Sequence, residues 1–329
     1  MNTESSKNNI KWPEIFSLAS LNVAVAISWI AYSEYQTVIL GEFGLNELDL
    51  FLIVAKAIIL VTIPPLAGLL ADMMMRKDNN YFIVYIIGIS LTAMVFMVVA
   101  TLLGIDSSSP IVSILPIMIV LWLISMNIFV SPAVSLVEMF APKKSLPIVM
   151  AVLVFFNEIV YALEPLVVGL VQFFGDVLTF VVGGILIIST GLFFYRQTKD
   201  EVKEKQKIST STVQSENKFM PIVYAGALIG LGKGFLVEYL PNLDHLEIIS
   251  GEYLAFFMLG LSAFVAFLSR NYVVRLGAEK VLFKSLIIIL ISSFSLFLSN
   301  NEIFILIFSL ILSASFGLAS ITGIPFAIS

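Results

Sequence analysis

The stretch RQTKDEVKEKQKISTSTVQSENK, residues 196–218, determines how the rest of the chain is interpreted. It holds ten charged residues and only three aliphatic ones, Val202, Ile208 and Val213. Such a stretch cannot bury enough apolar surface to fold alone, and in hydrocarbon its polar groups would stay unsatisfied. Long apolar segments flank it on both sides. The sequence therefore predicts a water-exposed connector between two membrane-embedded halves.

The composition excludes most soluble classes. The chain is 59% apolar and 12% charged, against roughly 25% charged residues in an ordinary soluble domain. Because it has no cysteine, it can form no disulfide, thiolate metal site or thiol nucleophile. The chain has a single histidine, which argues against a metal centre built from histidines. We expect no metal and no cofactor.

Ten apolar segments approach the length of about 20 residues that a membrane span needs. Six precede the connector and four follow it: Phe16–Leu40, Leu50–Ala71, Tyr81–Gly104, Ile111–Val130, Leu146–Phe174, Val177–Phe194, Phe219–Leu240, Tyr253–Leu268, Val281–Leu298 and Ile303–Ala327.

The positive charges predict the orientation. Sixteen of the eighteen lysines and arginines fall in the N-terminus, the connector or alternate loops. The other loops contain aspartates and glutamates but no lysine or arginine. The positive-inside rule makes the side with the cations cytoplasmic. We therefore expect a plasma (inner) membrane protein whose N-terminus, connector, Lys143 and Lys144 are cytoplasmic, with His245 outside.

The two halves contain a weak repeat. Ser33-Glu34-Tyr35-Gln36 in the first span is matched by Val237-Glu238-Tyr239-Leu240 in the seventh, and Pro132 by Pro325. Internal repeats of this kind are typical of secondary transporters.

Three motifs resemble the major facilitator superfamily. Gly68, Asp72 and Arg76 fit the G-x-x-x-D-x-x-x-R/K signature after the second span, although Met73 and Met75 replace a basic residue and a glycine. The segment 131–144, which contains Pro132, Glu138 and Lys143, is similar to the family's link between spans four and five. Glu164-Pro165-Leu-Val-Val-Gly169 resembles its fifth-span glycine-proline motif, with Glu164 in place of glycine.

The resemblance implies a fold and a domain organisation. The fold is an all-α integral membrane protein, a major-facilitator-type helical bundle with ten transmembrane helices, six plus four. The domains are an N-terminal six-helix bundle over 1–195, a cytoplasmic connector over 196–218 and a partial C-terminal bundle over 219–329. Family members have twelve spans, so we expect a truncated chain, with a natural ten-span variant as the alternative.

The resemblance also implies a cytoplasmic gate. Its residues are Gly68, Asp72 and Arg76 after the second span, and Arg275 and Gly277 after the eighth. The family's latch also uses span eleven, which leaves the latch in doubt here.

Ionisable residues within the spans carry the functional prediction, because a charge at mid-bilayer usually marks a pathway or a pair. The candidate residues for a substrate and proton pathway are Glu34, Lys56, Asn157, Glu158, Tyr161, Glu164, Lys233 and Glu238. The alternatives are that Glu34, Lys56 and Glu238 snorkel to the interface, and that Glu158 or Glu164 forms a structural pair with a lysine. Our working hypothesis is that Glu164 alternates between a protonated and a lysine-paired state, with Glu158 as the deeper second acid.

Three classes of function remain. The first is a secondary active transporter that moves a small solute by alternating access, coupled to protons. The second is a transporter-fold scaffold or delivery factor that transports nothing. The third, an intramembrane enzyme, lacks the G-x-S-x-G and H-E-x-x-H motifs and is not expected. The expected partners are a small solute, protons and the lipid bilayer, and no nucleic acid.

Overall fold

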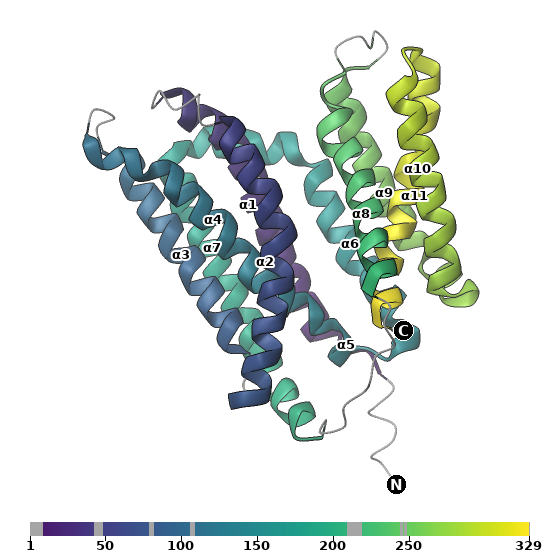
Figure 1. Ribbon diagram of the computed structural model, residues 1–329, viewed down its shortest axis with the longest axis horizontal. Helices are drawn as coiled ribbons and strands as arrows, with labels where there is room; N and C mark the ends of the chain where they lie inside the picture. Colours follow the sequence, from purple (N-terminus) through teal and green to yellow (C-terminus); the bar gives the residue numbers. More distant parts are fainter. Residues whose placement is uncertain are drawn as a thin grey trace. The chain divides into compact units, whose positions relative to one another are not determined.

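The computed structural model describes residues 9–42, 49–78, 82–105, 109–208, 219–243, 246 and 249–328. Over these residues every regular element is a helix (Figure 1). Ten of the described helices are long and apolar enough to cross a membrane, as the sequence predicts. They are α1 (Trp12–Glu42), α2 (Asp49–Asp78), α3 (Phe82–Leu103), α4 (Leu115–Ser135), α6 (Leu146–Ala162), α7 (Glu164–Ile208), α8 (Phe219–Gly234), α9 (Gly251–Leu276), α10 (Ala278–Leu298) and α11 (Glu302–Ile328).

Short elements join or extend these helices. Two 3₁₀ turns, Pro110–Ile114 and Lys143–Ser145, precede α4 and α6, and α5 (Val137–Phe140) follows α4. The π-helical turn η5 (Phe235–Tyr239) continues α8.

The helices are apolar on their outer faces as well as their inner ones. In α10, for example, Ile289 is fully buried while Ile287, Phe294 and Phe297 are exposed by more than half. A helix that is hydrophobic all round suits the interior of a large protein or a membrane. The exposed apolar surface therefore agrees with a helical membrane protein.

The backbone packs into two compact units. One, the α8–α11 unit, comprises Met1–Lys11, Phe140–Glu164 and Ser211–Ser329, and so contains α6 and α8 to α11. The other, the α1–α4 unit, comprises Trp12–Met139 and Pro165–Thr210, and so contains α1 to α4 and α7. Helix α6 packs with the C-terminal helices α9 and α11 in the α8–α11 unit. Whether 1–195 and 219–329 form functional domains stays a prediction.

In the α8–α11 unit, α9 lies beside both α6 and α11, and α11 also contacts α8 and α10 (Figure 1). Gly317 of α11 allows one of these close approaches, because a Cβ atom there would lie 2.5 Å from the carbonyl oxygen of Ser262 in α9. Between α6 and α9, the ring of Phe155 packs 5.6 Å from that of Phe264 and 5.2 Å from that of Phe267.

In the α1–α4 unit, α4 lies beside α2 and α3, and α7 packs against α3. The hydroxyl of Tyr85 in α3 donates a hydrogen bond of 2.9 Å to the carbonyl oxygen of Gly191 in α7. This bond satisfies a polar group that is otherwise surrounded by aromatic rings, including those of Phe129 and Phe194.

The first part of the predicted connector is helical. Helix α7 continues to Ile208, and Thr198 and Val202 are fully buried within it. Phe194, Thr198 and Val202 are four residues apart and therefore share one helical face, which explains why this polar stretch can still pack. Residues 209–218 lie outside the described residues, so the rest of the connector stays a prediction.

Two breaks interrupt the helices between Leu146 and Ile208. Leu163 leaves helical geometry just before Glu164 and Pro165, where proline removes a backbone donor. Gly175 has a φ of 71° inside α7, a conformation that favours glycine. The second break lies where the sequence predicts the loop between spans five and six.

Candidate functional site

An ion pair links α6 and α8 inside the α8–α11 unit. The Nζ atom of Lys233 donates to Oε2 of Glu158. The side-chain amide of Asn157 donates a hydrogen bond of 2.9 Å to the other carboxylate oxygen of Glu158. The Glu158 side chain is 5% exposed and that of Lys233 is 25% exposed. Both carboxylate oxygens therefore have donors, as a buried charge requires.

Aromatic rings cover the ammonium group of Lys233. Its Nζ atom lies 3.9 Å from the ring centroid of Tyr161 in α6 and 5.6 Å from that of Phe316 in α11. Cation–π attraction of this kind contributes about 0.5–2 kcal/mol, with the larger values at desolvated sites. The site is therefore built by α6, α8 and α11 together.

Both charged residues lie well past the starts of their helices. At 1.5 Å per residue, Glu158 is about 18 Å from the start of α6 and Lys233 about 21 Å from the start of α8. An apolar bilayer core is about 30 Å thick. If the helices cross a membrane, both charges lie far from water.

The helices on both sides of the pair are discontinuous. Helix α6 ends at Ala162, one turn after Glu158, and α8 ends at Gly234, one residue after Lys233. The π-helical turn η5 starts at the next residue, and π-helical turns are frequent at functional sites.

One of the three glycines beside Lys233 serves close packing. A Cβ atom at Gly232 would lie 3.2 Å from the Cγ2 atom of Ile289, so this glycine allows α8 to approach α10 closely. At Gly230 and Gly234 such an atom would meet nothing within 4 Å. Close packing is therefore a requirement at Gly232 alone among the three.

The pathway residues predicted from the sequence divide between the two units. Asn157, Glu158, Tyr161 and Lys233 come together as described. Glu164 is half-buried at the start of α7, and Glu238 is exposed in η5. Lys233 pairs with Glu158 in this structure. The pairing of Glu164 with a lysine therefore stays a prediction.

Glu34 and Lys56 lie in the α1–α4 unit. The side-chain amide of Gln172 donates a hydrogen bond of 3.0 Å to the carboxylate of Glu34. The Nζ atom of Lys56 lies 6.0 Å from the ring centroid of Trp29 and 5.9 Å from that of Tyr32. Both residues therefore have polar or aromatic neighbours within their own unit.

Three of the predicted gate residues lie on exposed surfaces. They are Asp72, Arg275 and Gly277, and Gly277 has a φ of 90° between α9 and α10. Gly68 packs near α4, because a Cβ atom there would lie 3.6 Å from the hydroxyl of Ser131. The side chain of Arg76 lies outside the described residues. The gate stays a prediction.

Two neighbours of the candidate residues were not predicted from the sequence. Phe316 is one of many phenylalanines in apolar segments, and no local signal distinguishes it. Gln172, which donates a hydrogen bond to Glu34, is a lone amide in the apolar run 165–174. An isolated amide in such a run is a usable signal, because it needs a hydrogen-bond partner.

Within the described part of the chain, no group of three or more His, Cys, Asp and Glu residues lies close enough to hold a metal ion. Comparison with models of known protein families gives no match, and no curated protein is significantly similar to the chain. The function is therefore argued from the site.

Proposed function

We propose that the chain is a secondary active transporter of the major facilitator type, which moves a small solute by alternating access and couples it to protons. The observation that carries this proposal is the largely buried pair of Glu158 and Lys233 within apolar membrane-length segments. A charge at the centre of a bilayer costs at least about 2.5–3.5 kcal/mol, so such residues are usually retained for function.

Broken helices beside the pair support the same function. Many secondary transporters bind solute and coupling ion near the midplane, where discontinuous helices expose backbone groups. Here α6 and α8 both end within one turn of the pair. Pro165 adds to this polarity, because it has no N–H to donate to the carbonyl of Tyr161.

The proposal includes insertion in the plasma (inner) membrane with the N-terminus and connector in the cytoplasm. Support comes from the charges of the α8–α11 unit. Lys143 and Lys144 precede α6, while Arg275 and Lys280 stand at the turn from α9 to α10. At the opposite ends of these helices, Glu252 starts α9 and Glu302 starts α11.

The proposed coupling step is protonation of Glu158. A protonated Glu158 no longer attracts the ammonium group of Lys233 as an ion, and Lys233 is then available to the solute or to Glu164. Loss of the proton restores the pair. An unpaired charge is costly in a low-dielectric medium. In this proposal, protonation of Glu158 is therefore coupled to pairing of Lys233 with the solute or with Glu164.

Reconstituted liposomes provide the test. The purified protein is placed in liposomes that contain a pH-sensitive dye, and sugars, amino acids, carboxylates and amines are added outside in turn. We expect at least one class to change the internal pH, and Glu158→Gln to abolish that change. The matched control is Glu252→Gln, which removes the same charge from an exposed position.

Two results would count against the proposal. If no class changes the internal pH with the wild-type protein, the scaffold alternative is favoured. If Glu158→Gln retains solute-driven pH changes of wild-type size, the pair is structural and does not couple protons.

A further inference from the structure

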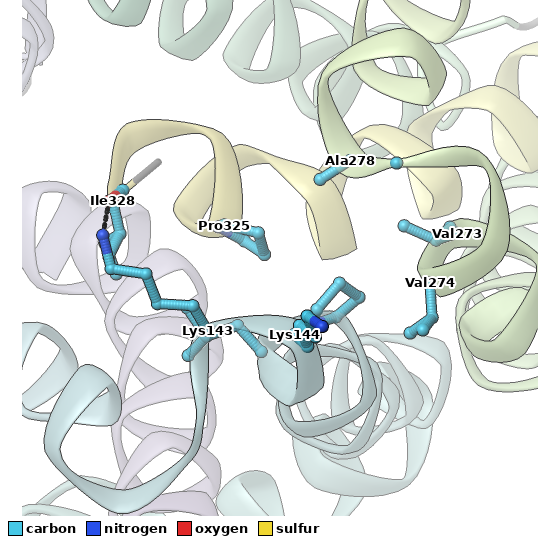
Figure 2. Close-up of a pocket in the computed structure, with 10 residues that line it drawn as sticks. Lys143, Lys144, Val273, Val274, Ala278, Pro325 and Ile328 are labelled. Atoms are coloured by element: carbon cyan, nitrogen blue, oxygen red, sulfur yellow. Dashed lines mark hydrogen bonds between the residues drawn. The ribbon is translucent and has the colours of Figure 1, made fainter.

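A pocket of about 450 Å³ lies at one end of the α8–α11 unit, where α6 and α10 begin and α9 and α11 end (Figure 2). It is separate from the Glu158–Lys233 pair, which lies about 18 Å along α6. Its volume falls within the range of small-molecule sites, about 300–1,000 Å³. Lys143 and Lys144 form one wall, and Val273, Val274 and Pro325 form the others.

The charged side chains that line the pocket are both cationic. Lys143 and Lys144 are both exposed, and Lys143 uses one of its three donors in a 3.0 Å hydrogen bond to the carbonyl oxygen of Ile328. No acidic residue is among the described residues that line the pocket. The start of α10 also faces it, with Gly277 as N-cap and Ala278 as first residue, and a helix start favours negative charge.

The remaining walls are apolar. Val273 and Pro325 are buried, and Val274 is 40% exposed at the rim. A small inorganic anion would contact the lysines but not the accessible apolar part of the lining. An anionic group joined to an apolar chain would contact both, so the pocket fits an amphiphile with a negative headgroup.

We propose that this pocket binds the phosphodiester headgroup of an anionic phospholipid. The lysines contact the phosphate, and the accessible apolar lining residues Val274, Ala278 and Ile328 contact the glycerol and the first acyl carbons. Basic pockets between transmembrane helices on the cytoplasmic side are suited to anionic headgroups. The inference rests on the proposed membrane insertion, but not on transport.

Native mass spectrometry of the full chain in detergent tests the inference. The wild-type protein is titrated with phosphatidylglycerol and, separately, with phosphatidylcholine. We expect it to prefer phosphatidylglycerol. The double variant Lys143→Gln with Lys144→Gln should weaken that binding about 30-fold, because each lysine contributes about 1 kcal/mol of attraction to anionic lipid. Lys280→Gln with Lys284→Gln is the matched control, because it removes two exposed cations that do not line the pocket.

A second variant tests the pocket rather than its charge alone. Val274→Glu places a carboxylate at the exposed rim, where it does not disturb buried packing, and we expect it to weaken phosphatidylglycerol binding as the lysine variant does. Equal loss in the control variant, or wild-type binding by Val274→Glu, would overturn the inference. So would displacement of the lipid by millimolar glycerol 3-phosphate, since the site would then be one for soluble phosphates.

Discussion

At the residue scale, the Glu158–Lys233 pair carries a large electrostatic cost, because the Glu158 carboxylate is only 5% exposed. Taking two charges out of water costs several kcal/mol for each ion, and their attraction offsets this only with good geometry and further hydrogen bonds. Asn157 and Tyr161 supply those contacts. Well-packed apolar residues would often stabilise such a position at least as well, so stability alone does not account for two charges at this place.

Unfolding of variants in detergent measures how strongly the two residues depend on each other. Removing one partner of a fully buried pair costs about 3–5 kcal/mol, and less is expected here because Lys233 keeps part of its side chain exposed. We expect Glu158→Leu and Lys233→Met each to lower the unfolding midpoint clearly. The double variant should recover most of the loss, because no unpaired charge remains. Additive losses would contradict a direct pair.

At the scale of the elements, small residues determine how closely the helices approach. Gly317 of α11 has no room for a side chain beside Ser262, whereas Gly226 of α8 is exposed and its Cβ would meet nothing within 4 Å. Apolar helices in membranes associate through such close contacts, because lipid is as apolar as their own side chains.

The two glycines should therefore respond in opposite ways to alanine. Gly317→Ala forces α9 and α11 apart, and we expect a loss of about 1–3 kcal/mol, the usual cost of overpacking. Gly226→Ala should be neutral or stabilise by up to about 1 kcal/mol, since alanine is the better helix former. Thermal unfolding in detergent compares them. Similar losses in both would mean that the close approach of α9 and α11 does not limit stability.

At the scale of the whole molecule, the sequence predicted the ten apolar helices and proposed Glu158 and Lys233 as candidate residues. It could not predict which acid meets Lys233. Glu158 and Glu164 are six residues apart, so they differ by about 120° around a continuous helix, and the break at Leu163 changes their directions further. The rotation of α6 against α8 depends on tertiary packing, which no local pattern contains.

The sequence also could not predict that α6 packs with the C-terminal helices, because contacts between apolar helices leave no polar pattern. The extension of α7 to Ile208, in contrast, has a signal in the sequence. The residues Phe194, Thr198 and Val202 recur every four residues, as on one face of a helix. The polar composition around them led instead to the prediction of a connector from residue 196.

The orientation can be tested with single cysteines, because the chain has none of its own. Lys144→Cys and Glu252→Cys are exposed and stand at opposite ends of the α8–α11 unit. We expect an impermeant thiol reagent to label Glu252→Cys but not Lys144→Cys in intact cells, and both after permeabilisation. The reverse labelling pattern would invert the proposed topology.

The central claim is that Glu158 takes up a proton within the membrane. Electrical recording from protein on a solid-supported membrane tests it most directly, since a pH step requires no knowledge of the solute. The account predicts a transient current in the wild-type protein, no such current with Glu158→Gln, and a normal current with Glu252→Gln. A current of wild-type size in Glu158→Gln would contradict the account.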